Sequence, residues 1–133
     1  MAIQLGVTYR NAMLDQLETT VGIIPRLNIY TGAQPSSASM TATGELIISL
    51  LLPSDWMNAA SGGSKTLLGS WTGSASGSGN AGHFRILSSA SVVGMQGSIT
   101  ATAGGGDMTL DNISVSASQT VTVTTFSLTA PGV

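Results

Sequence analysis

Residues able to perform chemistry are few in this chain of 133 residues, which has one histidine, six acidic residues and no cysteine. Hydrolysis by a serine nucleophile needs a base and an orienting carboxylate beside the serine. His83 is the one candidate base, and the candidate orienting carboxylates are Asp55, Asp107 and Asp111. Because the sequence has no G-x-S-x-G turn to present a nucleophile, we favour a structural role for His83 and expect no catalytic residues.

Two glycine-rich segments are candidate ligand sites. "SGGSKT", residues 61–66, lacks the glycine that directly precedes the lysine of a phosphate-binding loop. "TAGGGDMTLDN", residues 102–112, supplies too few oxygen ligands for a calcium loop. Paired carboxylates for sugar cleavage are not excluded by spacing, but aromatic residues make up only 5% of the chain. We therefore expect a turn and a hairpin tip, with no cofactor and no metal.

The composition is poor in charge. Charged residues make up 8% of the chain, the net charge is −2 and the mean hydropathy is +0.34. Four scattered cations argue against a nucleic-acid partner, which requires a clustered basic face. "ELIISLLLP", residues 45–53, is much shorter than the roughly 20 residues of a membrane-spanning helix. A surface with so little charge favours association with copies or partners.

One segment has helical periodicity, over about residues 8–21. Thr8 is the expected N-cap and Gly22 the expected residue after the last turn. Its apolar stripe consists of Tyr9, Met13 and Leu17 at successive i+4 steps, with Leu14 and Val21 beside them. We expect this amphipathic helix to lay the stripe on its own sheet or on a neighbouring subunit. The opening residues lack a secretory signal pattern, so we also expect a cytoplasmic product.

The rest of the chain, about residues 26–129, reads as seven or eight short strands separated by turn residues. This pattern predicts a mainly β, antiparallel sandwich or jelly-roll-like barrel within a single domain, 1–133. Residues 46–52 are apolar in both phases, which predicts a strand covered on both sides, the second cover being the helix or another chain. The apolar phase changes near Thr124 and Thr125, which predicts a β-bulge.

The stretch "SGSGNAGHFRIL", residues 76–87, places a loose glycine-rich run before the histidine. The glycines predict a mobile hairpin tip over residues 74–82. Alternation then puts Phe84 and Ile86 in the core and His83 with Arg85 on the outer face. We expect these two polar side chains to orient a contact between subunits.

Three segments carry a resemblance to small virion structural proteins of tailed bacteriophages and prophages. They are "LPSDWMNAASGGSKTLLGSWTGSASGSGNAGHFRI", "QGSITATAGGGDMTLDN" and "QTVTVTTFSLT". The resemblance covers most of the chain and consists of turn and strand patterns without a catalytic signature. It implies an assembly component located in the virion and assembled in the host cytoplasm.

Within a virion, we favour a capsid decoration or cement protein. Such a protein would bind the major capsid shell as an oligomer, expected to be a homotrimer, and would have no nucleic-acid or membrane partner. The alternative is a tail, baseplate or fibre module involved in host attachment. The residues expected at its interfaces are Tyr9, Ile47, Leu51, Trp56, His83 and Arg85.

Overall fold

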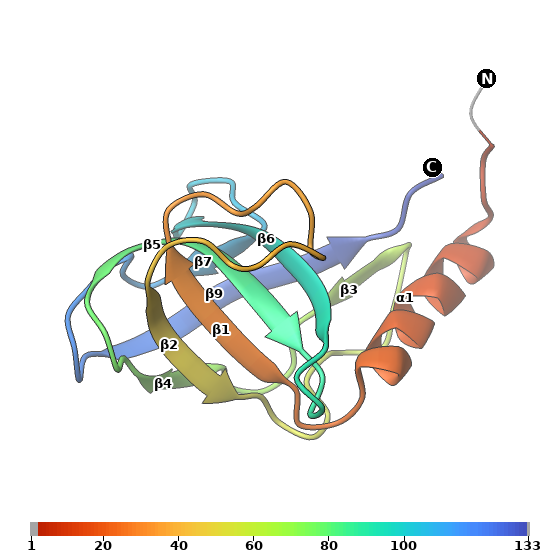
Figure 1. Ribbon diagram of the computed structural model, residues 1–133. Helices are drawn as coiled ribbons and strands as arrows, with labels where there is room; N and C mark the ends of the chain where they lie inside the picture. Colours follow the sequence, from red (N-terminus) through yellow and green to blue (C-terminus); the bar gives the residue numbers. More distant parts are fainter. Residues whose placement is uncertain (1–2, 133) are drawn as a thin grey trace.

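Residues 3–132 are described by the structure, a computed structural model, and they form one helix and nine strands (Figure 1). In chain order these are α1 (Val7–Val21), β1 (Arg26–Thr31), β2 (Leu46–Leu51), β3 (Ser64–Thr66), β4 (Thr72–Ser74), β5 (Gly79–Leu87), β6 (Val93–Ala101), β7 (Met108–Leu110), β8 (Ser114–Val115) and β9 (Thr120–Thr129). The chain is therefore mainly β, with a helix near its N-terminus, as predicted.

The strands form one mixed, largely antiparallel sheet that bends into a sandwich-like arrangement. Its order is β2-β1-β5-β6-β7-β9-β3, with β4 also paired to β9 and β8 paired to β5. The pair β6 and β7 is parallel, whereas the other strand pairs are antiparallel. In Figure 1, β9 (blue) crosses behind β1 and β5, so the two ends of the sheet face each other.

The core lies between these two layers and is centred on aromatic rings. Phe84 of β5 meets Phe126 of β9 edge to face, with ring centroids 5.5 Å apart. Trp71 lies 5.3 Å from Phe126, and Trp56 lies 6.0 Å from Trp71. All four rings are almost fully buried, and aliphatic side chains of β1, β2 and β7 fill the space around them. Burial of this apolar surface drives the closure of the sheet.

A β-bulge explains the apolar run in β2 and corrects our prediction of a strand with two covers. Ile29 of β1 pairs with Ile48, but the next residue, Tyr30, pairs with Leu46, so Ile47 is the extra residue. Ile47 and Ile48 are both fully buried, whereas Leu46 and Leu51 are exposed. The bulge turns two consecutive side chains inward, and the strand therefore needs no second apolar cover.

The bulge predicted in the last strand is confirmed. Thr109 pairs with Thr125 and Leu110 pairs with Val123, so Thr124 is the extra residue of β9. The shift allows Val123 and Phe126 both to face the core, although they lie in opposite phases of the sequence.

The helix begins one residue earlier than predicted and buries part of the predicted stripe. Its N-cap is Gly6 in place of Thr8, and it ends at Val21, followed by Gly22 at φ +91°. Leu14 and Val21 are buried and Leu17 is half-buried, as the stripe predicts, whereas Tyr9 is 71% exposed and Met13 is 45% exposed. The side of the helix that faces the sheet is also held by polar contacts, described below.

Two loops of the structure also differ from the sequence-based prediction. The connection between β6 and β7 is not a hairpin tip, because these strands run parallel. The glycine-rich segment before β5 is not a hairpin tip either, because β4 pairs with β9 and β5 pairs with β1, β6 and β8. It is also shorter than predicted, since β4 ends at Ser74 and β5 already begins at Gly79.

Gly82 is a bulge residue inside β5. Tyr30 pairs with His83 and Thr31 pairs with Ala81, so Gly82 has no partner across the pair. A Cβ atom at this position would overlap the backbone of Gly32. A glycine is therefore required where the two strands approach most closely.

We predict that Gly82→Ala lowers the free energy of unfolding by about 2 kcal/mol, because the backbone of Gly32 must move. Gly6→Ala is the control, since a Cβ there meets only Tyr9 at 3.8 Å, and it should cost less than about 1 kcal/mol. Urea denaturation of the two variants measures both values. Equal losses would contradict the close approach of the strands.

Candidate functional site

His83 and Arg85 lie on the face of β5 opposite the core residues, but they are not open to solvent. His83 is fully buried and Arg85 is 4% exposed. The cover is the connection between β1 and β2, residues 32–45, which passes over this face of the sheet (Figure 1). The alternation of side chains along β5 thus predicted the face of His83 and Arg85 correctly. Our expectation that the two side chains point outward from the surface is wrong. The sequence alone does not show that the loop 32–45 folds back over this strand.

Arg85 connects this loop to the sheet. Its Nη2 atom donates to the carbonyl oxygen of Met40 at 2.7 Å and to Oε1 of Gln96 at 3.0 Å. Gln96 in turn donates from Nε2 to the carbonyl oxygen of Pro35 at 2.8 Å. A buried guanidinium requires acceptors, and this one takes them from the covering loop and the neighbouring strand.

His83 also contacts the loop through its ring. Nδ1 lies 2.9 Å from the carbonyl oxygen of Gly32 and donates to it, since a carbonyl only accepts. The ring stacks on Tyr30 with centroids 5.1 Å apart. Nε2 is buried and has no hydrogen-bond partner within the described residues. A serine–histidine–carboxylate arrangement is therefore not assembled at His83.

We predict that Arg85→Ala loosens residues 32–45 while the sheet stays folded. Loss of the bonds to Met40 and Gln96 should speed amide hydrogen exchange in the loop by about tenfold, or about 1.4 kcal/mol. Arg26→Ala is the matched control, because Arg26 is exposed and donates to Ser49 of β2 and not to the loop. Unchanged exchange in Arg85→Ala would show that the loop does not depend on this cation.

The helix is attached to the sheet by a second buried cation. Lys65 of β3 is 2% exposed, and its Nζ lies 2.7 Å from Oδ1 of Asp15 and 2.7 Å from Oε2 of Glu18. Asp15 also accepts the backbone N–H of Ala60 at 3.0 Å, and Asn11 accepts that of Gly63 at 2.8 Å. These contacts attach one face of α1 to residues 60–65, which confirms "SGGSKT" as a turn leading into a strand.

The two charges stabilise each other. The hydrogen bond from Lys65, followed by that from the Ala60 amide, lowers the pKa of Asp15 below its usual value of 3.8. Burial alone lowers the pKa of Lys65, but its hydrogen bonds to Asp15 and Glu18 outweigh burial and raise that pKa above 10.5. Because the folded pKa of Asp15 is depressed, its contribution to stability is complete above about pH 4 to 5 and is lost on acidification.

We predict that the free energy of unfolding falls between pH 5 and pH 3, and that Asp15→Asn makes this fall shallower. Lys65→Met should have the same effect on the pH dependence, because it removes the partner that depresses the pKa of Asp15. Urea denaturation at pH 5, 4 and 3 measures the slopes. Identical slopes for the wild type and Asp15→Asn would contradict a stabilising ion pair.

Exposed apolar side chains gather around the connection between α1 and β1. Ile23 is 68% exposed and Ile24 is 42% exposed. Leu51 at the end of β2 and Val92 in the turn between β5 and β6 are also exposed. We call Ile23, Ile24, Leu51 and Val92 the connector surface.

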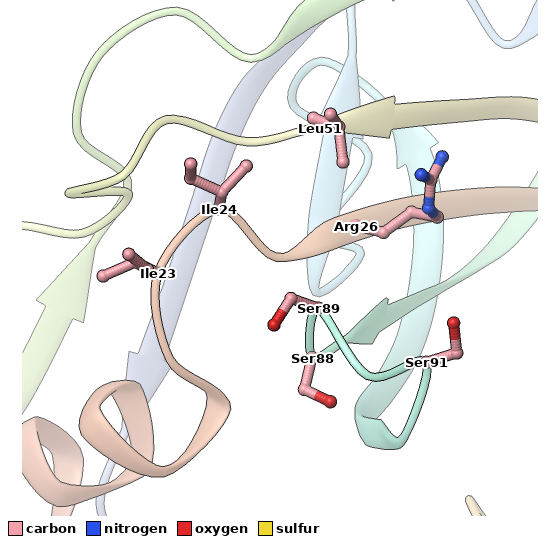
Figure 2. A pocket seen from close by; sticks show the side chains of 7 residues that line it. All are labelled: Ile23, Ile24, Arg26, Leu51, Ser88, Ser89 and Ser91. Atoms are coloured by element: carbon pink, nitrogen blue, oxygen red, sulfur yellow. The ribbon is translucent and has the colours of Figure 1, made fainter.

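Three hollows surround this surface. The first has a volume of about 380 Å³ and is lined by Ile23, Ile24 and Leu51 together with the serines of the β5–β6 turn. Figure 2 shows these residues. A second hollow shares Ile23 and extends towards Asp55. A third lies between the end of α1 and Val92 and shares Ser88 with the first. The arrangement suits an apolar contact with a macromolecule better than enclosure of a small ligand.

A second exposed apolar area is the flank of α1. It consists of Tyr9 and Met13, one helical turn apart, which are 71% and 45% exposed. These two residues lie on the side of the helix away from Asn11, Asp15 and Glu18, so the contacts of Lys65 and Asn11 leave them free. We call these two residues the helix flank.

The six residues expected at interfaces therefore separate into two groups. Tyr9 and Leu51 are exposed, on the helix flank and on the connector surface. Ile47, Trp56, His83 and Arg85 are buried, so their side chains serve the fold of the chain. Trp56 donates from Nε1 to the carbonyl oxygen of Gly22 at 3.0 Å, and it lines the second hollow from beneath.

Sequence reasoning missed the role of Lys65 and the exposure of Ile23 and Ile24. A signal was present for Lys65: it is the only lysine of the chain, and Asp15 and Glu18 are spaced to share a helix face. Ile23 and Ile24 follow the helix and belong to no strand pattern, so no periodicity indicates that they are exposed.

Residues 3–132 contain no helix long and apolar enough to cross a membrane. Over the same part of the chain, no three acidic or histidine side chains come together as a metal site. Comparisons of the chain with protein-family models, with curated proteins and with solved structures find no match.

Proposed function

We propose that this chain is a structural protein of a tailed-phage virion, and specifically a capsid decoration or cement protein that binds the major capsid shell. The observation that carries the proposal is the amount of apolar surface on a charge-poor protein. Ten large hydrophobic side chains of the described residues are exposed, and six of them form the helix flank and the connector surface. Exposed apolar groups gathered in patches favour binding to other proteins.

The placement of the cations supports the same proposal. Two of the four cations, Lys65 and Arg85, are buried and hold segments of the chain in place. The outer surface is therefore even less charged than the composition suggests. Low surface charge offers little repulsion between proteins, which suits a component that is packed in many copies on a shell.

We assign the shell contact to the helix flank. The helix is held to the sheet through Lys65, Asp15 and Asn11, so the exposed Tyr9 and Met13 are presented on a fixed element. A preorganised apolar surface binds without the entropy cost of ordering a loop. Small contacts of this kind, repeated over the copies of a trimer and over the shell, add up to resistance against internal pressure.

Counting copies in purified particles tests this role. A decoration protein should occur at a number comparable to that of the major capsid protein, and particles lacking it should open at a lower temperature. Quantitative mass spectrometry and thermal dye release measure the two quantities. A few copies per particle, with unchanged head stability and lost adsorption, would instead support the tail or fibre role.

We predict that Tyr9→Asp and Met13→Asp reduce binding to purified shells by at least tenfold, because each places a charge in an apolar contact. Thr19→Asp is the matched control, since it adds the same charge to an exposed position of α1 six residues beyond Met13. Circular dichroism verifies that each variant is folded. Undiminished binding of both flank variants would contradict the assigned contact.

A further inference from the structure

The connection between α1 and β1 holds an isoleucine in an unfavourable backbone conformation. Ile24 has φ +49°, in the left-handed region that β-branched residues rarely adopt. It also precedes Pro25, and a residue before proline prefers extended backbone. Glycine or asparagine would fit this position with less strain. The side chain of Ile24 is therefore retained at a cost to the folded chain.

The fold itself makes limited use of that side chain. Ile24 is 42% exposed and does not belong to the hydrophobic core, and its neighbour Ile23 is 68% exposed. Both line the hollow that Leu51 and the serines of the β5–β6 turn complete (Figure 2). Exposed apolar side chains such as these stabilise a protein only when another surface covers them and removes them from water.

Charges on the two sides of the connector surface indicate what covers it. Arg26 lines the first hollow and Asp55 lines the second, and Ile23 is common to both. Both charged residues are exposed. Arg26 donates from Nη1 to Ser49 at 3.0 Å, while the carboxylate of Asp55 has no hydrogen-bond partner among residues 3–132. The surface thus has an apolar centre, a cation on one side and a free anion on the other.

We propose that copies of this chain pack against one another through the connector surface, around a symmetry axis that passes beside Ile23. Arg26 of each copy then faces Asp55 of the next. A surface with opposite charges on its two sides is complementary to a rotated copy of itself. Nucleic acid would require clustered cations here, whereas the hollows around Ile23 are lined by the cation Arg26, by the anion Asp55 and by Glu18, which is paired with Lys65.

This contact is separate from the proposed shell contact on the helix flank, and it concerns the purified chain alone. Its failure would leave shell binding through Tyr9 and Met13 untouched. Success would give the ring of copies that a trimeric decoration protein requires.

Charge reversal tests the contact. Light scattering coupled to size-exclusion chromatography, from about 5 to 200 µM, should show the wild type as an oligomer. Arg26→Asp and Asp55→Arg should each weaken self-association by at least tenfold, because like charges then face each other. The double variant R26D/D55R should restore the oligomer, since the exchanged pair is again opposite in charge. Glu45→Arg, an exposed acid on the covering loop, is the control and should leave the mass unchanged.

A second variant separates association from folding. Ile24→Asn suits the left-handed backbone, so the variant should be folded and at least as resistant to urea as the wild type. It should also lose the oligomer, because it removes the apolar centre. A monomeric wild type at 200 µM, single reversals without effect, or a double variant that stays monomeric would each overturn the proposal.

Discussion

A cation removed from water must be given hydrogen-bond acceptors, and this requirement attaches the helix and the loop 32–45 to the sheet. Lys65 reaches out of β3 to two carboxylates of α1. Arg85 reaches out of β5 to a carbonyl of the loop 32–45. If either cation were replaced by a neutral side chain of similar size, the segment would remain in the sequence but lose its principal polar attachment. The strands form the body of the protein, and the two cations determine what covers it.

The same arrangement explains the character of the surface. Charges that would ordinarily keep protein molecules apart are used inside this fold. The loop 32–45 covers the polar face of β1, β5 and β6, and α1 covers β3, so apolar side chains are left exposed at the places between covers. The connector surface lies at one such place, where α1 ends and the sheet begins. The exposure of the connector surface is thus a consequence of where the two covers stop.

Periodicity in the sequence predicted which helices, strands and bulges form better than it predicted what surrounds each side chain. The helix, the mainly β architecture and the bulge at Thr124 follow from periodicity, because each depends on neighbouring residues. The environment of His83 depends on a loop more than forty residues earlier, and no periodicity in β5 reports it. The bulge at Ile47 was hidden because an apolar run gives the same pattern whether a strand is covered twice or bulged once. Of the candidate site, sequence reasoning reached Tyr9 and Leu51 but missed Ile23 and Ile24.

The position of β9 in the chain has a consequence for synthesis. This strand pairs with β7, β3 and β4, and its Phe126 contacts both Phe84 and Trp71. Every one of these partners is translated before β9, so the core around Phe84 and Trp71 cannot close until residues 120–129 have been made. Formation of the packed core therefore waits for this strand. During that interval its unpaired strands are most vulnerable to aggregation and proteolysis, and a truncation within β9 removes a central partner of the sheet.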